Sequence, residues 1–394
     1  MNLDQISFEN KTALIRVDFN VPLNEKLEVT DTTRIQAAKD TIIHVLEYGG
    51  DVVLMSHLGR PDGTVQDKYS LKHIVDTVSD ILGVQVQFIA ESTGEAVKEK
   101  AKNLQAGEVL MIENLRFHKE ETDGDEGFAK ELAALGDVYI NDAFGTAHRA
   151  HASTTVVAQF FEEKCYGKLM SKEIESLKKV LETPTEPVVA ILGGAKVSSK
   201  ITVIENILEK VDHLILAGGM AYTFIKAQGG KTGESLVEDD KQELALEILE
   251  KAKKLNTQIH LPVDSITAAS FSEQATRDVA PIDEIPDGWM GLDIGEESRK
   301  QFAEVIKKCK TILWNGPAGV FEMEPFSHGT IALGNAVAEA TENGAFSLVG
   351  GGDSVSAVKQ FGFEDKVSYV STGGGAMLEM LEGKTLPGIK AIQD

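Results

Sequence analysis

The chain has 394 residues, of which 42% are hydrophobic and 26% are charged, and its formal net charge at pH 7 is −23. This length and composition predict two or three domains with ordinary apolar cores, and they exclude a single small module and a disordered polypeptide. The negative charge argues against nucleic acid or an anionic membrane surface as a partner.

Neither a membrane span nor an export signal is visible in the sequence. No apolar run approaches the roughly 18 residues that a span needs, and the opening MNLDQISFEN lacks the basic start and apolar stretch of a signal peptide. We therefore expect a cytosolic protein. The only two cysteines, Cys165 and Cys309, are too few for a cysteine zinc site, and we expect both to be packing residues without a disulfide.

In the first half of the chain, short β-rich apolar runs alternate with helical patterns. The runs predict strands over residues 12–18, 51–56, 108–114 and 137–142. The patterns between them predict helices over residues 33–47, 69–81 and 126–135. This alternation is typical of βαβ units and a parallel sheet.

A second series of runs begins after Pro184 and Pro187, beyond a helical stretch around 168–182. It predicts strands over residues 188–194, 212–219, 258–264, 311–316 and 345–351. We therefore predict an α/β fold with two domains of similar size, each a mainly parallel sheet flanked by helices, joined by a helical hinge with a cleft between them. We expect the domains at 1–170 and 171–384, with the tail at about 385–394 packing back on the first.

Five of the seven arginines lie in the first 150 residues, and most of them follow predicted strand ends. The carboxyl ends of parallel strands meet at one edge of a sheet, so these side chains should converge. One surface arginine is usually a solvated ion pair, but a cluster favours phosphate or carboxylate, to which arginine donates two parallel hydrogen bonds. The predicted cluster contains Arg16, His57, Arg60, Arg116, His148, Arg149 and His151.

Arg34 occupies an unusual place for a cation. Asp31, Thr32 or Thr33 should cap the helix over 33–47 and place Arg34 in its first turn. The helix dipole disfavours a positive charge there by a few tenths of a kcal/mol. A bound anion would offset that cost.

Glycine clusters mark the second half of the chain. They lie at 193–194, 218–219, 350–352 and 373–375, where strands would pass into helices. Glycine there lets the backbone approach a phosphate at a helix N-terminus. One cluster could simply make a tight turn, but four at equivalent positions favour a phosphate site. The dinucleotide fingerprint is missing at these glycines. The GKT strings at 230–232 and 383–385 lack the earlier glycine that Walker A requires.

Three charged residues adjoin the glycine clusters. Lys196 and Lys200 are four positions apart and should share one face near a helix start. Asp353 follows a glycine triplet, where it would be either a helix N-cap or a ligand of Mg²⁺ beside bound phosphates.

Eight strings, in this order over nearly the whole chain, closely resemble the phosphoglycerate kinase family. They are RVDFNVP, SHLGRP, ENLRFH, NDAFGTAHRAH, LGGAKVSSKI, WNGPAGVFE, GGGDS and STGGGA. The length resembles the compact bacterial form. One small departure is Ser354, where many relatives carry threonine.

The resemblance implies a glycolytic kinase that reversibly transfers the acyl phosphate of 1,3-bisphosphoglycerate to Mg-ADP, giving 3-phosphoglycerate and ATP. It implies that the first domain binds 3-phosphoglycerate or 1,3-bisphosphoglycerate through Asp18, Asn20, Arg34, His57, Arg60, Arg116 and Arg149. It implies that the second domain binds Mg-ADP or Mg-ATP through Lys196, Lys200, Gly291, Asn315, Glu322, Gly350, Gly351, Gly352, Asp353, Ser354 and a helix starting near Thr372. By the same resemblance, Glu322 would contact the ribose, Asp353 the metal, and the protein would be a monomer.

Such a transfer needs no general base, because both attacking groups are anions at neutral pH. The site must supply in-line positioning and positive charge. The candidates are Arg34, Lys196, Lys200, Mg²⁺ on Asp353, and the N–H groups near Gly373 and Gly374. Substrates bound to different domains can meet only if the domains close, which would also exclude water.

Two alternatives compete with this interpretation. A non-catalytic bilobal anion-binding protein would also use arginines and glycine loops, but it would not explain Lys196, Lys200 and Asp353. An NAD-dependent dehydrogenase is the second alternative, and the missing fingerprint weighs against it.

Overall fold

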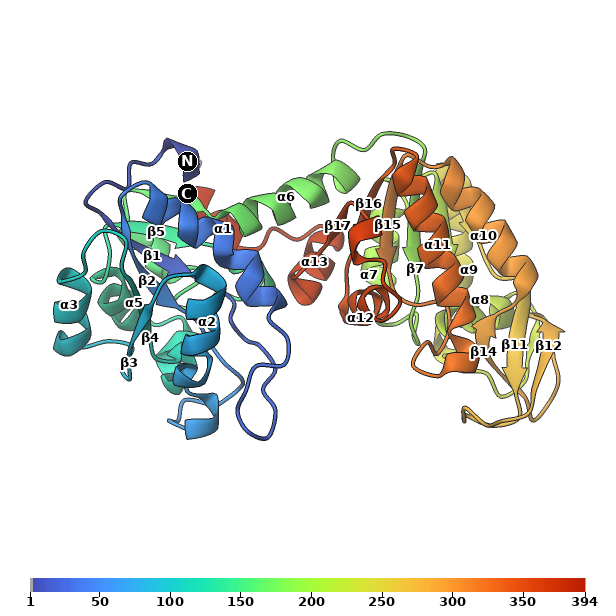
Figure 1. The fold of residues 1–394 in the computed structure, drawn as a ribbon. Coiled ribbons are helices and arrows are strands. Elements are labelled where there is room, and N and C mark those ends of the chain that lie inside the picture. The colour runs from blue at the N-terminus through green and yellow to red at the C-terminus, as the bar shows by residue number, and fades with distance from the viewer. Residues whose placement is uncertain (1–2, 394) are drawn as a thin grey trace. The chain divides into compact units, whose positions relative to one another are not determined.

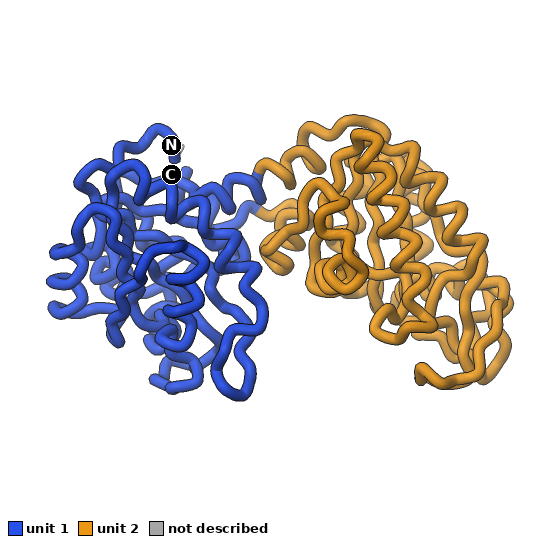
Figure 2. The backbone as a smooth tube through the Cα atoms, in the orientation of Figure 1, with its two compact units in different colours: residues 1–174, 385–394 blue, residues 175–384 orange. Residues whose placement is uncertain are grey.

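The computed structural model describes residues 3–393. The chain forms two compact units, which are residues 1–174 with 385–394 (unit 1) and residues 175–384 (unit 2), as Figure 2 shows. The chain passes from one to the other within helix α6 (Lys168–Leu181) and again between Lys384 and Thr385. Among the described residues, no helix has the length and apolar character that crossing a membrane requires.

Unit 1 is built on a six-stranded parallel sheet in the order β3-β4-β2-β1-β5-β6 (Figure 1). Its strands are β1 (Thr12–Arg16), β2 (Asp51–Met55), β3 (Val86–Ile89), β4 (Val109–Ile112), β5 (Val138–Asn141) and β6 (Lys164–Tyr166). Its helices, besides the start of α6, are α1 (Thr33–Glu47), α2 (Val75–Leu82), α3 (Glu95–Lys102), α4 (Lys119–Asp123), α5 (Glu126–Ala133) and α14 (Pro387–Gln393). Alternate residues of β1 enter two different apolar clusters, with Ile15 in one and Leu14 in the other, so both faces of the sheet are covered.

The C-terminal helix α14 belongs to unit 1. Tyr166 donates its hydroxyl to the carbonyl of Ile389 at 2.6 Å, and the backbone N–H of Gly388 donates to the carbonyl of Ala147 at 2.9 Å. The side-chain amide of Asn141 donates to the carbonyl of Gly388 at 3.3 Å. These contacts tie the end of the chain to β5, to β6 and to the loop that follows β5.

Unit 2 has a second six-stranded parallel sheet in the order β10-β8-β7-β15-β16-β17. Its strands are β7 (Val188–Leu192), β8 (His213–Leu216), β10 (Gln258–His260), β15 (Thr311–Asn315), β16 (Phe346–Val349) and β17 (Tyr369–Val370). Its helices are α7 (Ile201–Ile207), α8 (Met220–Ala227), α9 (Gln242–Leu255), α10 (Glu296–Lys308), α11 (His328–Glu342), α12 (Gly352–Gln360) and α13 (Gly374–Leu381).

Two small sheets complete unit 2. An antiparallel sheet joins β12 (Arg277–Pro281), β11 (Asp264–Ala268) and β14 (Met290–Ile294), and a short parallel pair joins β9 (Lys231–Thr232) to β13 (Glu284–Ile285). The strand predicted over 258–264 is therefore wrong as one element. The chain leaves β10 after His260, passes Leu261 and Pro262, and joins the antiparallel sheet at Asp264.

The predicted fold class, two α/β units each built on a parallel sheet flanked by helices, is confirmed. The short edge strands β3, β6 and β17 were not predicted. The helix predicted over 69–81 is instead a 3₁₀ turn (Leu71–Ile74) followed by α2. Cys165 and Cys309 are buried free thiols, as predicted.

Candidate active site

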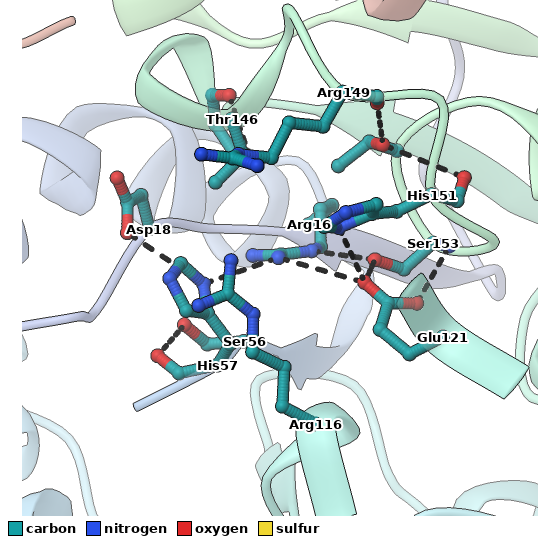
Figure 3. A network of polar contacts seen from close by, with 12 residues as sticks. Arg16, Asp18, Ser56, His57, Arg116, Glu121, Thr146, Arg149, His151 and Ser153 are labelled. Carbon is teal, nitrogen blue, oxygen red and sulfur yellow. Dashed lines mark hydrogen bonds and ion pairs between the residues drawn. The ribbon is translucent and has the colours of Figure 1, made fainter. Parts of the chain in front are cut away.

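Four neighbouring strands of unit 1, in the order β4-β2-β1-β5, deliver the polar side chains of one cluster from their carboxyl ends. Arg16 is the last residue of β1, His57 lies two residues after β2, and Arg116 lies in the 3₁₀ turn after β4. Arg149 and His151 come from the loop that follows β5. Figure 3 shows these five side chains together; we call them the arginine cluster.

Arg16 lies at the bottom of this cluster with no exposed surface. Its Nε donates to Ser153 Oγ at 2.7 Å, Nη1 donates to the carbonyl of Val17, and Nη2 lies 3.3 Å from His57 Nδ1. We predicted a substrate contact for Arg16. That prediction needs correction, because a fully enclosed guanidinium can act on a ligand only through the side chains that it holds.

The sequence did not predict two residues, Glu121 and Ser153, that hydrogen-bond to one another beside Arg16. Glu121 is buried, and its carboxylate accepts the hydroxyl of Ser153 at 2.6 Å and the Ser153 backbone N–H at 3.0 Å. Ser153 is buried as well. Glu121 stands in the charged string HKEE, which is typical of a solvated helix face, so only its place directly after ENLRFH could have drawn attention to it.

Arg34 lies in the first turn of α1, as predicted, and has a partner within unit 1. Its Nη1 donates to Asp18 Oδ2 at 3.0 Å and to the carbonyl of Asn20 at 3.2 Å. The carboxylate of Asp18 therefore supplies part of the negative charge that the helix start lacks. The Arg34 side chain remains 37% exposed, so the guanidinium can still reach a ligand.

The arginines carry the positive charge of the cluster, while two of its histidines are neutral. Burial, followed by the charges of Arg16 and Arg116, holds the pKa of His57 well below its usual value. Burial and the same two arginines lower the pKa of His151 to about 4. Both rings are therefore uncharged at neutral pH.

The remaining residues of the predicted cluster differ in exposure. Arg60 and Arg149 are exposed, and His148 is half-buried. Arg116 donates from Nη1 to the carbonyl of Gly59 at 2.9 Å, and its buried Nε has no hydrogen-bond partner within residues 3–393. Burial, with the charges of Arg16 and Arg149, lowers the pKa of Arg116 to about 10. Unit 1 thus presents exposed guanidinium groups above a buried, hydrogen-bonded layer made of Arg16, Glu121 and Ser153.

In unit 2, three of the four glycine clusters pass directly into helices. Gly218 and Gly219 precede α8, Gly350 and Gly351 precede α12, and Gly373 precedes α13. The prediction for 193–194 is wrong, because α7 begins only at Ile201. Lys196 is an exposed loop residue and Lys200 directly precedes α7, so the two lysines do not share a helix face.

The starts of α12 and α13 lie side by side. A Cβ on Gly374 would be 3.8 Å from the backbone nitrogen of Gly352 and 4.0 Å from the Cα of Gly351. Helix N-termini carry unpaired N–H groups and positive partial charge, so two adjacent ones favour an anion. Thr372 lies two residues before the start of α13, and the N–H of Gly373 donates to Ser371 Oγ at 3.2 Å.

Lys200 is linked through Asn315 to the turn before α12. Its amine contacts the side-chain oxygen of Asn315 and lies 3.3 Å from the Asn315 carbonyl. Burial lowers the pKa of Lys200 to about 8, and the charge of Asp353 partly opposes this. Asn315 in turn donates its amide to the carbonyl of Gly350 at 2.8 Å, and Ser354 Oγ accepts the N–H of Gly316 at 2.6 Å. Asn315 and Ser354 thus fix the turn at Gly350–Gly352.

A pocket of about 480 Å³ lies beside this turn. Its lining includes Gly194, Gly218, Gly291, Glu322 and Asp353 together with apolar side chains such as Leu236 and Val320. An apolar wall with a few polar groups at its rim is typical of a small-molecule site.

Asp353 is an exposed residue in the first turn of α12, and the N-cap is Gly351, so the N-cap interpretation of Asp353 is wrong. Within residues 3–393 no group of three or more His, Cys, Asp or Glu could hold a metal. Mg²⁺, however, is commonly held by one or two carboxylates plus substrate phosphates. The single exposed carboxylate of Asp353, beside two helix starts that favour phosphate, fits that ion.

The comparisons with known proteins agree with one another. The family model described as phosphoglycerate kinase matches residues 3–384. The chain is 51% identical over 418 residues to the phosphoglycerate kinase of Porphyromonas gingivalis, covering 100% of both chains. It is 50% identical over 393 residues to the cytosolic phosphoglycerate kinase of Nicotiana tabacum, covering 100% of this chain and 98% of the relative. The phosphoglycerate kinase structure from Coxiella burnetii matches with a TM-score of 0.92 and 41% identity, covering 100% and 98% of the two chains.

Proposed function

The chain belongs to the phosphoglycerate kinase family, and we propose that its two units divide the binding work of that family's reaction. The protein is accordingly a kinase of glycolysis, an enzyme, and the non-catalytic alternative has no support. We assign 3-phosphoglycerate or 1,3-bisphosphoglycerate to unit 1 and Mg-ADP or Mg-ATP to unit 2. The reaction proposed is reversible transfer of the acyl phosphate of 1,3-bisphosphoglycerate to Mg-ADP.

The observation that carries the assignment of unit 1 is the convergence of three arginines and two histidines at four adjacent strand ends. A substrate with a phosphate and a carboxylate needs several cationic donors, and arginine offers paired hydrogen bonds to both groups. We propose that Arg34, Arg60, Arg116 and Arg149 contact the substrate. Asp18 and Asn20 orient Arg34, while the neutral His57 ring can accept or donate a hydrogen bond without adding charge.

In unit 2, we propose that the nucleotide occupies the pocket of about 480 Å³. Gly291 and Glu322 both line this pocket, and the Glu322 carboxylate would accept hydrogen bonds from the ribose hydroxyls. The phosphates would extend toward Gly350–Gly352 and Thr372, where two helix starts favour anions. Lys200 lies at this end of the site.

The proposed chemistry is direct in-line transfer of the phosphoryl group. Arg34 and Lys200 supply positive charge to its equatorial oxygens, Lys196 adds an exposed cation, and the N–H groups of Gly373 and Gly374 donate hydrogen bonds. Mg²⁺ held by Asp353 would supply further positive charge to the phosphate oxygens. No residue needs to remove a proton, because the attacking oxygen is already an anion.

We further infer that the two units close on one another when both substrates are bound. Groups held by different units can react only when brought to contact, and closure excludes water from the acyl phosphate. We also propose that the protein acts in the cytosol as a monomer whose partners are small molecules, with neither nucleic acid nor membrane among them.

A coupled assay of ATP-dependent phosphorylation of 3-phosphoglycerate tests this function. We expect turnover that requires Mg²⁺ and is lost when 3-phosphoglycerate is omitted. A matched control is Arg277→Ala, because Arg277 is an exposed arginine outside the cluster; it should retain wild-type turnover. A folded protein without turnover under these conditions would refute the proposal.

A further inference from the structure

A buried carboxylate lies beneath the arginine cluster. Glu121, in α4, has no exposed surface, and its Oε1 lies 3.9 Å from Arg16 Nη2 and 3.8 Å from His151 Nδ1. Both of its oxygens also accept hydrogen bonds from Ser153, as Figure 3 shows. One carboxylate therefore joins the end of β1 to the loop that follows β5.

Among the residues that the structure describes, Glu121 has the only carboxylate within 4.0 Å of the buried guanidinium of Arg16. The other Arg16 contacts are neutral: the Ser153 hydroxyl, the Val17 carbonyl and the uncharged ring of His57. The Ser153 hydroxyl relays the interaction, since it accepts from Arg16 Nε at 2.7 Å and donates to Glu121 Oε1 at 2.6 Å. An enclosed guanidinium without a negative partner is strongly destabilising, so this contact is needed while the site holds no anion.

The positive charges of Arg16, Arg116 and Arg149 repel one another, and the negative charge of Glu121 offsets part of this repulsion. Arg16 and Arg149 both act to lower the pKa of Arg116, whereas the carboxylates of Glu121 and, to a smaller extent, Asp18 act to raise it. A bound anionic substrate would relieve the same repulsion. Glu121 and the substrate therefore compensate the same positive charge, one from below the cluster and the other from its exposed side.

We propose that Glu121 is the built-in counter-anion of the arginine cluster, which keeps Arg16 and Ser153 in place in the empty site and limits how tightly the cluster binds an anionic substrate. This inference rests on the proposed function of unit 1. Glu121 is a positioning residue, because it has no surface with which to touch a ligand. Its charge would keep the affinity for 3-phosphoglycerate low enough for release.

The test is the variant Glu121→Gln, which keeps the shape and one acceptor oxygen but removes the charge. We expect the KM for 3-phosphoglycerate and the Kd for inorganic phosphate to fall by about tenfold, because a negative charge close to the anion is lost. The KM for ATP should stay unchanged. The thermal midpoint without phosphate should fall, and phosphate should raise it more than it raises that of the wild type.

Glu113→Gln is a matched control. Glu113 is also a buried glutamate of unit 1 whose oxygens accept a serine hydroxyl, from Ser70 at 2.6 Å, and a backbone N–H, from Leu71 at 2.8 Å. It has no ion pair within 4.0 Å among the residues that the structure describes. Its substitution should lower the thermal midpoint without increasing the affinity for phosphate.

A second variant separates charge from hydrogen bonding. Glu121→Asp keeps the negative charge but shortens the reach to Ser153, so it should lower the thermal midpoint while the Kd for phosphate stays within about threefold of the wild type. If Glu121→Asp binds phosphate as tightly as Glu121→Gln, the charge is not the cause and the proposal is overturned.

Three further outcomes overturn it: a KM for 3-phosphoglycerate in Glu121→Gln that is unchanged, one that is raised, or a Glu121→Gln chain that stays unfolded even in tens of millimolar phosphate. Phosphate affinity is read from thermal unfolding and needs no turnover. A wild type without kinase activity would therefore refute the proposed function, while the comparison of phosphate affinities would still decide the role of Glu121.

Discussion

The two units present positive charge to anions in different ways. Unit 1 uses side chains. Its exposed guanidinium groups lie above a buried layer in which Arg16 and Glu121 have no exposed surface. Unit 2 uses mainly the backbone: glycine turns bring the starts of α12 and α13 together, and Lys200 is the cation beside them. A side-chain site can be altered one charge at a time, whereas a backbone site depends on turns that only glycine adopts easily.

This difference suits the two proposed ligands. A small molecule with two anionic groups must be held by several directed donors, which arginines provide. A nucleotide adds a large apolar base, which a pocket can enclose, so its phosphates need fewer charged side chains. We therefore expect ligand binding to depend mainly on the charges of side chains in unit 1 and mainly on the backbone conformation of the glycine turns in unit 2.

The largest effect is expected from Arg34→Ala in unit 1. Arg34 is held by Asp18 and Asn20 yet remains partly exposed, so we expect it to stabilise the transferring phosphoryl group more than the bound substrate. Loss of such an arginine lowers kcat by about 10³ to 10⁵, or about 4 to 7 kcal/mol, with little change in substrate affinity. Steady-state kinetics and a direct binding measurement separate the two. A kcat within tenfold of the wild type would exclude this role.

Substitution of Lys200 should have the next largest effect on the rate, and the titration of Lys200 should make kcat/KM depend on pH. Its pKa is lowered to about 8, so the charged form is present below pH 8 and is lost as the pH rises through that value. We expect kcat/KM for the nucleotide to fall above about pH 8. Lys200→Ala should lose about 10² to 10³ in rate at pH 7.

Lys200→Arg provides the matching control, because an arginine stays charged throughout this pH range. Whatever its absolute rate, its kcat/KM should not fall between pH 7 and pH 9, a range that ends below the pKa of about 10 of Arg116. A decline identical to that of the wild type would show that another group titrates.

Asp353→Asn should raise the Mg²⁺ concentration needed for half-maximal rate by at least about tenfold. Asp353 is exposed, so its replacement should change the free energy of unfolding by no more than about 0.5 kcal/mol. A magnesium titration of the rate, together with thermal unfolding, tests both statements. An unchanged magnesium requirement would remove Asp353 from the metal site.

The smallest effect on activity is expected from a substitution in the glycine turn of unit 2, at Gly351. Gly351 has φ of +94°, and a Cβ there would lie 2.6 Å from Asn315 Nδ2. Gly351→Ala should cost about 1 to 3 kcal/mol of stability and weaken nucleotide binding several-fold, with no change in phosphate affinity at unit 1. Gly344→Ala is the control, since Gly344 has a similar φ of +91°, nothing lies within 4 Å of its Cβ position, and it does not line the pocket. Equal losses of nucleotide affinity from both variants would show that the turn at Gly351 has no special role.

Site residues could be predicted from the sequence where they directly follow a buried strand or lie at the start of a helix. Buried strands such as Asp51–Met55 and Val109–Ile112 have clear apolar runs, and the residues that follow them in the chain must lie at the sheet edge. The placement of Arg34 followed from the N-terminus of one helix. In each case a local pattern and one rule of sheet or helix geometry were sufficient.

The sequence was uninformative where burial depends on distant parts of the chain. Glu121 is enclosed because Ser153, 32 positions later, packs over it, and no local pattern distinguishes it from a solvated glutamate. The same packing encloses Arg16. Lys196 and Lys200 have helical spacing, but Gly194 adopts φ of +118° and the chain reaches α7 only at Ile201.

The central claim is that each unit holds one substrate and that transfer requires their closure. Small-angle scattering can test this directly, with the protein alone, with 3-phosphoglycerate, with a non-hydrolysable Mg-ATP analogue, and with both ligands. The account predicts a radius of gyration that is smallest when both ligands are present. The same radius in all four conditions would contradict it.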